Sequence, residues 1–360
     1  MEIEKLLIKK RQIQEKILEY IESEEDEKAS FQALSQQLDD FQIQEDSLEF
    51  KSFLHLIVAI SNNHHRNSDF FTRISQIILK YTDSLKKISN TQIFEIFKTN
   101  KRLLLFLLQE NLLVIDDHIA KKIESFRSAK YPQYFLPELK PFINRETYDK
   151  YSKEIGDNFE ENRNIGENEN YISQLIRNDS LDEFISLHQK GDVALDSKIK
   201  ESIFETNSYL LNEKPSLIEY AAFFGSSQIL KYIQLNDIKL TKSLMIYAIH
   251  SMNYELIHFL EENEIKPDYS SFYKECFKES VLCHHLSLSQ YFIDHYSDDS
   301  ETFFYLESYN FQYLKPNNIK ISYYHLEFLE YDYSDIIKLY LEDDKNDVNE
   351  KIDHISNSKF

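Results

Sequence analysis

Apolar side chains recur every three or four positions over most of the chain, and short polar segments separate these stretches. This spacing is typical of amphipathic helices, whereas strands alternate apolar and polar residues. Only 4 glycines and 6 prolines occur in 360 residues, too few for the many tight turns of a β protein. The pattern therefore predicts an all-α fold.

The N-terminal half is predicted to be helical throughout. Residues 1–46 form two helices separated by the acidic segment 22–27. Residues 47–144 keep the helical spacing, and a polar break separates the apolar stretches 92–97 and 103–108. A short helix, a turn and a longer helix are also the unit that repeats downstream. We therefore interpret 47–144 as a degenerate relative of those repeats.

The middle of the chain has a different composition. Prolines at positions 132, 137 and 141 remove backbone donors and interrupt the helical spacing. Residues 145–170 are mostly charged or amide side chains and include two of the glycines. This segment is predicted to be an acidic linker or loop. The alternative is a long charged helix, which the glycines disfavour.

Residues 216–233 and 243–260 repeat each other at a spacing of 27 residues. Each contains an apolar stretch, a turn at Gly225 or Met252, and a second apolar stretch. A repeated helix–turn–helix unit indicates a stacked solenoid, because one unit cannot bury its apolar face alone.

Less regular units extend the repeat region to 171–350, with the clearest part at 215–265 and a C-terminal tail at 351–360. Their turns are predicted at Asp179, His284 and Asp332. The resulting spacings of 46, 27, 32 and 48 residues require insertions in some repeats.

Residues 216–233 resemble the ankyrin repeat. Ala221-Ala222 match its alanine pair, Gly225 matches the glycine of its turn, and Ile229-Leu230 with Ile233 match the apolar face of its second helix. The opening Thr-Pro-Leu-His is replaced by Ser216-Leu217-Ile218-Glu219. The resemblance implies an ankyrin-like helical solenoid with irregular repeats and a helical N-terminal region. By the same resemblance, 47–144 is ankyrin-like.

The chain also resembles a large set of ankyrin-like protist proteins that carry a domain of unknown function. The stretches that carry this resemblance are 61–66, Asn100-Lys101-Arg102, 203–208 and 217–225. The resemblance implies protein–protein interaction and supplies no catalytic residue.

The composition limits the classes of binding partner and the cellular compartment that we expect for this protein. The net charge of −21 repels nucleic acid and anionic membranes. The longest apolar run, Leu103–Leu108, is far below the roughly 20 residues that span a bilayer, so no membrane insertion is expected. Two cysteines provide no disulfide framework, which fits a reducing compartment. We expect an intracellular, cytoplasmic protein.

Candidate chemistry is sparse. Cys276, Cys283, His284 and His285 offer ligand atoms that zinc accepts, but their spacing matches no zinc finger or ribbon. We interpret these histidines, and His64-His65, as turn and capping residues. A Cys–His nucleophile needs a base that the sequence does not identify. Phosphate-binding and hydrolase motifs are missing, so we expect no enzyme, cofactor or metal.

The ankyrin resemblance places variable contact residues at the end of the first helix of each unit, just before the turn. The candidate partner-binding residues at these positions are Phe223, Phe224, His250, Ser251, Glu330 and Tyr331, with Leu282 and Cys283 in the fourth unit. The alternative is that these side chains pack against neighbouring repeats.

The function predicted is a non-enzymatic scaffold that binds an unidentified protein through its repeats. Two alternatives stay open. One is an adaptor or regulatory subunit whose N-terminal helices and C-terminal repeats bind different proteins. The other is an enzyme of unknown type, which requires a deep polar pocket.

Overall fold

A computed structural model describes residues 2–24, 26–126, 130–156, 158–267, 271–296, 302–314 and 325–342. Over these residues the fold is all-α, as the apolar spacing predicts, and no strand occurs among them. An isolated backbone bridge joins Lys198 to Ser216. None of the described helices is both long enough and apolar enough to cross a bilayer. The predicted tail 351–360 lies outside the described residues.

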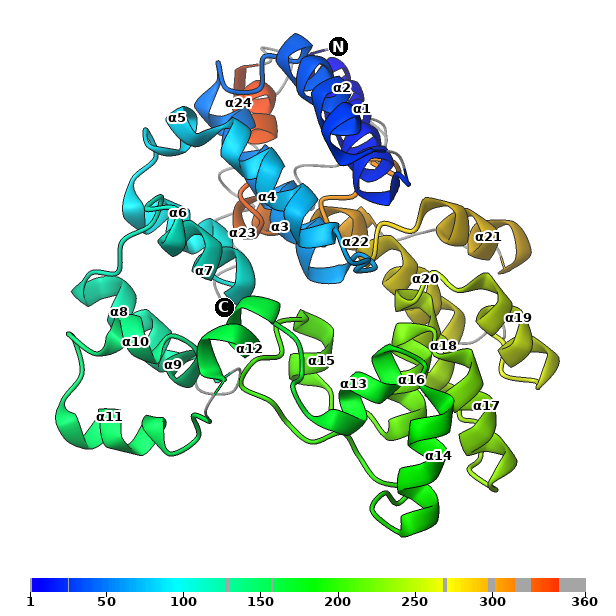
Figure 1. Cartoon of the computed structure of the whole chain (residues 1–360). Helices are drawn as coiled ribbons and strands as arrows, with labels where there is room; N and C mark the ends of the chain where they lie inside the picture. The colour runs from blue at the N-terminus through cyan, green and yellow to red at the C-terminus, as the bar shows by residue number, and fades with distance from the viewer. Residues whose placement is uncertain are drawn as a thin grey trace, which may run out of the picture. The chain divides into compact units, whose positions relative to one another are not determined.

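The chain divides into two compact units (Figure 1). Unit 1 comprises residues 1–61, 66–84 and 297–360, and unit 2 comprises 62–65 and 85–296. The first unit is therefore built from both ends of the chain, and the second from its middle. This division differs from the boundaries at 46, 144 and 170 that the sequence predicts.

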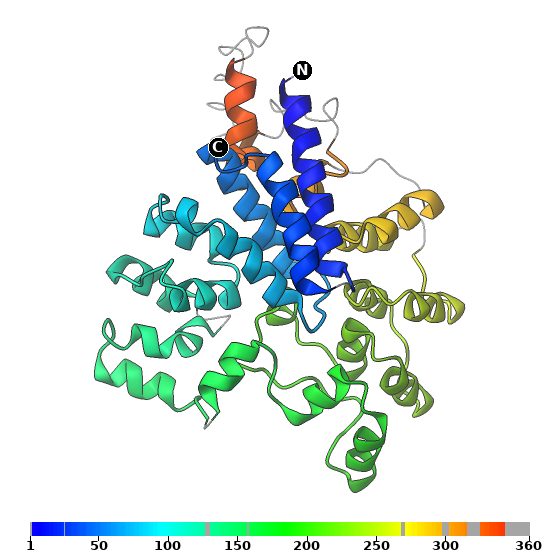
Figure 2. The same ribbon diagram turned by 45° about the horizontal axis from the view of Figure 1, so that its top comes forward.

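Unit 1 has N-terminal and C-terminal helices packed together. Its helices are α1 (Glu2–Glu22), α2 (Glu27–Asp40), α3 (Ser47–Asn63, whose last two residues group with unit 2), α4 (Phe70–Lys80), α22 (Thr302–Glu307), α23 (His325–Glu330) and α24 (Ser334–Glu342), and α5 (Thr82–Leu85) lies at the boundary. Helix α1 packs against α2, α4 and α24 (Figure 2). The predicted break at 22–27 does separate α1 from α2.

Buried polar contacts join the two ends of the chain inside unit 1. Lys10 of α1 is buried and forms an ion pair with Asp335 of α24. The amide of Gln14 donates to Asn310 Oδ1 at 3.0 Å and accepts from the Phe311 N–H at 2.7 Å. The unit around Asp332 therefore groups with the N-terminal helices, whereas the sequence assigns it to one array over 171–350. Such pairings between distant residues leave no periodic signal in the sequence.

The first part of unit 2 runs from residue 85 to about residue 170. Its helices are α6 (Asn90–Phe97), α7 (Lys101–Gln109), α8 (Asp117–Ser125), α9 (Tyr131–Tyr134), α10 (Leu136–Leu139), α11 (Arg145–Ser152) and α12 (Phe159–Ile165). The predicted pair at 92–97 and 103–108 corresponds to α6 and α7. Pro132 and Pro137 are the second residues of α9 and α10, in the first turn, where the missing N–H would have no partner within the helix.

Residues 145–170 contain α11 and α12 instead of the predicted linker or loop. Arg163 of α12 is buried and donates to the Glu138 carboxylate at 2.8 and 3.0 Å, to Glu160 at 2.9 Å and to the Tyr134 carbonyl at 3.2 Å. A buried guanidinium that is satisfied by several acceptors fixes this segment to the rest of unit 2. Some of the charged side chains of residues 145–170 therefore form ion pairs within unit 2, and the sequence alone does not show these pairs.

The second part of unit 2 is a series of helix pairs. They are α13 (Tyr171–Arg177) with α14 (Leu181–Lys190), α16 (Leu217–Phe224) with α17 (Ser227–Leu235), α18 (Ser243–His250) with α19 (Tyr254–Glu262), and α20 (Ser271–Leu282) with α21 (Leu286–Tyr296), while α15 (Ser208–Asn212) precedes α16. The first helices α13, α16, α18 and α20 pack on one another in this order (green to gold in Figure 1).

Each pair turns through a residue in the left-handed region. Asp179, Gly225, Met252 and His284 have φ between 47° and 71°, and Asp332 of unit 1 has φ 49°. These are the five turn positions that the sequence predicts. At all of these turns except the one at Met252, the residue after the turn donates its N–H five positions back, as in Ser226 to Ala221 at 2.8 Å and His285 to Ser280 at 3.0 Å. This geometry ends the first helix and redirects the chain.

Candidate functional site

The predicted partner-binding residues do not form one exposed surface. Phe223, His250 and Ser251 are buried in unit 2, and Phe224 is half-buried. Glu330 is exposed and Tyr331 is half-buried, and both belong to unit 1. The three buried side chains therefore pack inside unit 2, which is the alternative interpretation of the sequence. None of the three is available to a partner while unit 2 is folded.

Aromatic stacking explains why these side chains are buried. The Phe223 ring of α16 lies 4.6 Å from the His250 ring of α18, with the planes 27° apart. Tyr209 of α15 lies 4.4 Å from His250 and 6.1 Å from Phe223, measured between ring centroids. Equivalent positions of consecutive helix pairs thus face one another, and the cluster joins α16 to α18.

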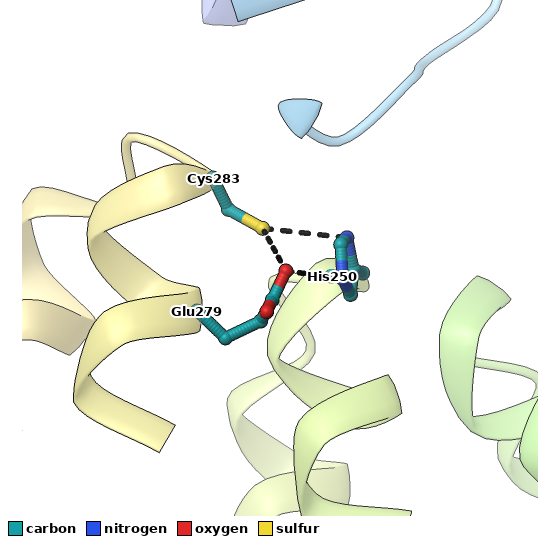
Figure 3. Close-up of side chains that lie close together, drawn as sticks. All are labelled: His250, Glu279 and Cys283. Carbon is teal, nitrogen blue, oxygen red and sulfur yellow. Dashed lines mark hydrogen bonds and ion pairs between the residues drawn. The ribbon is translucent and has the colours of Figure 1, made fainter. Parts of the chain in front are cut away.

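Three side chains with metal-ligand atoms meet next to this stack. His250 is the last residue of α18, Glu279 lies in the last turn of α20, and Cys283 follows α20 directly (Figure 3). His250 Nε2 lies 2.9 Å from Glu279 Oε1, and His250 Nδ1 lies 3.3 Å from Cys283 Sγ. Cys283 Sγ lies 4.0 Å from the same carboxylate oxygen. One ligand atom from each residue lies within 4.8 Å of the others.

The imidazole between Glu279 and Cys283 is desolvated. His250 and Cys283 are buried, and the Glu279 side chain is 13% exposed. The Nε2 contact with Glu279 is close but is not aligned as a hydrogen bond. Burial, with the negative charge of Glu279, raises the pKa of the Cys283 thiol well above its ordinary value. The protonated thiol is then positioned to donate to His250 Nδ1.

Two further histidines, His64 and His285, lie near the backbone of Cys283. His64 Nδ1 donates to the Cys283 carbonyl at 2.8 Å, and the His64 ring lies 5.0 Å from His285. His285 is buried, and neither of its ring nitrogens has a hydrogen-bond partner among the residues that the structure describes. Burial, with the neighbouring histidines led by His64, lowers the pKa of His285 well below its ordinary value.

The sequence identified only part of this cluster. It singled out Cys276, Cys283, His284 and His285, but only Cys283 joins the group of three. His250 and Glu279 were missed as ligands because they belong to different helix pairs. A signal was present, since His250 and Cys283 both lie just before a turn in consecutive units. Stacking of those units brings the two side chains together.

The order Cys283–His250–Glu279 is also that of a thiol nucleophile, its base and an orienting carboxylate. Nucleophilic catalysis requires a reactive thiolate that a substrate can reach. Cys283 is 0% exposed, and its pKa is raised rather than lowered. The arrangement therefore fits a structural or ligand-holding role, and a catalytic thiol is disfavoured.

Three stretches that carry the protist-family resemblance meet in a buried polar network. Asn100 Nδ2 donates to Asn62 Oδ1 at 2.9 Å, and Asn62 Nδ2 donates to Thr99 Oγ1 at 3.1 Å. Asn207 Nδ2 donates to the Asn62 carbonyl at 3.4 Å. The Lys101 ammonium donates to the Ile203 carbonyl at 3.1 Å. This network holds the segment 203–208 in place, which gives these residues a structural reason to occur together.

A pocket of about 330 Å³ lies beside the same segment of unit 2. Its walls come mainly from residues 199–215, with Lys130, Asn168 and Tyr220 on the other side. Polar and apolar groups are mixed, and Lys200, Glu201 and Lys214 place charges of both signs at its edge. The pocket is concave and solvent-accessible, so it can accept a ligand or a segment of another chain.

Comparison with known proteins gives no relative. No family model, curated protein or solved structure matches the chain. The resemblance to ankyrin repeats therefore rests on the residues quoted above.

Proposed function

We propose that this protein is a non-enzymatic scaffold that binds another protein through ankyrin-like repeats of unit 2. The observation that carries the proposal is the series α13, α16, α18 and α20, whose pairs share left-handed turns at equivalent positions. Stacked pairs of this kind present extended surfaces rather than a single catalytic centre.

Hydrogen bonds between consecutive pairs support the ankyrin-like interpretation. Glu219 accepts from Ser216 in a capping box, and its other carboxylate oxygen accepts from Ser243 Oγ of the next unit at 2.8 Å. Asn253 Nδ2 donates back to the Gly225 carbonyl at 3.2 Å. Both bonds join the pair α16/α17 to the pair α18/α19, as expected where neighbouring repeats stack in register.

We assign partner binding to the pocket bounded by residues 199–215 because the repeat-end side chains of α16 and α18 are buried. The pocket combines exposed charges with apolar walls, which suits a short segment of a partner chain. Phe224 remains half-buried and contributes to packing with Tyr220 at a ring distance of 4.8 Å.

Affinity capture from native cell extract tests this assignment with two matched variants. Lys200→Trp fills the pocket, and Lys239→Trp makes the same change at an exposed lysine elsewhere in unit 2. We expect the wild type and Lys239→Trp to capture the same partner. Lys200→Trp should bind that partner about tenfold more weakly, which corresponds to roughly 1.4 kcal/mol of binding free energy. Equal capture by all three proteins contradicts the pocket assignment, and no capture by the wild type contradicts the scaffold.

The adaptor alternative is favoured by one observation, the division into two compact units. In that case unit 1 binds a second partner, and the exposed end of α23 at Glu330 and Tyr331 is where the sequence places contact residues. Capture with Tyr331→Ala beside Lys200→Trp separates the two functions. Loss of different partners supports an adaptor, and loss of the same partner supports a single scaffold.

A further inference from the structure

The cluster of His250, Glu279 and Cys283 has the composition of a metal site. Imidazole, carboxylate and thiolate are all ligands of zinc, and a thiolate with an imidazole favours zinc over calcium or magnesium. One ligand atom from each residue lies within 4.8 Å of the others, and the sulfur and a carboxylate oxygen are 4.0 Å apart, so one ion can take a single nitrogen of His250 together with Cys283 and Glu279. Two consecutive helix pairs contribute these atoms, so the convergence depends on the fold.

Charge balance supports a divalent cation at this position. A buried carboxylate without a full counter-charge is costly, and Glu279 has only the imidazole of His250 beside it in this cluster. A bound divalent ion with the Glu279 carboxylate and a Cys283 thiolate makes a neutral buried unit. The site also lies at the C-terminal ends of α18 and α20, where the helix dipoles favour positive charge.

One imidazole nitrogen of the cluster gives further evidence for a missing polar occupant. The Nε2 atom of His250 is buried and makes no aligned hydrogen bond. Buried polar atoms in native proteins are nearly always paired with protein, water or an ion. The Nε2 atom of His250, which faces the Glu279 carboxylate without an aligned hydrogen bond, is therefore a nitrogen that an ion can take.

We propose that His250, Glu279 and Cys283 bind one zinc ion that joins α18 to α20. Three protein ligands leave the fourth tetrahedral position to water. The ion links consecutive helix pairs next to the aromatic stack of Tyr209 and Phe223. Its role is structural, because the burial of Cys283 excludes substrate.

Cobalt titration of the full-length protein, purified without a histidine tag and freed of metal, tests the site. Co²⁺ replaces Zn²⁺ and gives a thiolate-to-cobalt charge-transfer band when a cysteine binds it. We expect one Co²⁺ per chain with this band, displacement by Zn²⁺, and a thermal midpoint that rises with Zn²⁺.

Cys283→Ala and Cys276→Ala form a matched pair, because both remove a buried thiol in the α20 region. Loss of a residue that only orients a metal ligand weakens metal binding about 10–100-fold, so loss of the Cys283 ligand itself is expected to weaken it by more than about 100-fold and to abolish the band. Cys276→Ala retains both. Circular dichroism checks that each variant folds, and Glu279→Gln, which keeps its shape, decides the question if Cys283→Ala does not fold.

Results for the wild type and for each variant can overturn the proposal of a zinc site. A wild-type protein that binds no Co²⁺, or binds it without the thiolate band, has no such site. A band that survives in Cys283→Ala, or disappears equally in Cys276→Ala, places the ion elsewhere. Glu279→Gln with unchanged affinity removes that carboxylate from the ligand set.

Discussion

At the scale of single residues, Lys101 is the most unusual charged group of unit 2. Its side chain is fully buried, and its ammonium lies over the rings of Tyr134 and Tyr131 at 5.0 and 5.8 Å. Burial lowers the pKa of Lys101 to about 7, while the charge of Glu205 opposes the shift. The hydrogen bond that Lys101 donates to the Ile203 carbonyl offsets part of the cost of this burial.

The pKa of Lys101 predicts a pH dependence of stability. Between about pH 7 and its ordinary value of 10.5, the unfolded chain binds a proton that the folded chain has lost. The free energy of unfolding therefore rises with pH in this window, by up to about 1.4 kcal/mol per pH unit from this residue. Urea unfolding of the wild type and of Lys101→Met at pH 7, 8 and 9 measures it. Parallel profiles contradict the prediction.

Gly225 combines a left-handed backbone with close packing. Its φ is 71°, and an added Cβ lies 3.2 Å from Ser251 Cβ and 3.3 Å from Asn253 Cβ. Gly191 has φ 80° but no atom within 4 Å of such a Cβ. We expect Gly191→Ala to cost about 1 kcal/mol and Gly225→Ala about 1 kcal/mol more, because only the second adds a clash. Equal losses in urea unfolding count against the close approach.

Because Phe223 is buried, its removal is expected to lower the stability of unit 2 and not only to affect partner binding. Phe223→Ala leaves a cavity beside Tyr209 and His250, and we expect a loss of about 3–5 kcal/mol in unfolding free energy. Phe224→Ala, at a half-buried position, should cost much less. Thermal and urea unfolding compare the two variants. A stable Phe223→Ala protein that has lost its partner instead indicates direct contact.

At the scale of elements, the turn at Asp179 also caps the next helix pair. The Asp179 carboxylate follows α13 and accepts from the backbone N–H groups of Gln228 and Ile229 at 3.0 and 2.9 Å, in the first turn of α17. Ser226 Oγ donates in the opposite direction to the Ile176 carbonyl at 2.5 Å. These bonds fix the stagger between pairs, because helix ends otherwise leave such groups unpaired.

Substitution of Asp179 tests this coupling. Asp179→Gly accepts the φ of 47° but loses both bonds to α17, and we expect a loss of about 1–2 kcal/mol. Asp179→Asn also tolerates this backbone and keeps an acceptor oxygen, so it should lose less than half as much. Hydrogen exchange at the start of α17 and urea unfolding measure both effects. Identical behaviour of the two variants excludes a capping role.

At the scale of the whole molecule, the two compact units predict two cooperative unfolding events. Ile17 is fully buried in unit 1 and Leu230 is fully buried in unit 2. We expect Ile17→Ala to lower only one transition in calorimetry and Leu230→Ala only the other, each by about 2–5 kcal/mol of unfolding free energy. A single transition that both substitutions lower equally means that the units unfold as one.

The sequence by itself determined the helices and their turns. Helical spacing of apolar residues depends on local geometry, so it located α1, α3, α6, α7 and the helix pairs of unit 2. Turn positions at 179, 225, 252, 284 and 332 followed from the repeat register, and each has a left-handed backbone. Glycine was needed only at Gly225, because Asp, Met and His reach the same region at moderate cost.

Tertiary structure decided which helices belong together and which side chains are buried. The ion pair of Lys10 with Asp335 joins the two ends of the chain in unit 1. The hydrogen bond of Arg163 with Glu138 fixes the charged segment 145–170 within unit 2. His250, Glu279 and Cys283 become neighbours only when α18 stacks on α20. The local spacing of apolar residues cannot predict these contacts, because they join residues that lie far apart in the sequence at no regular interval.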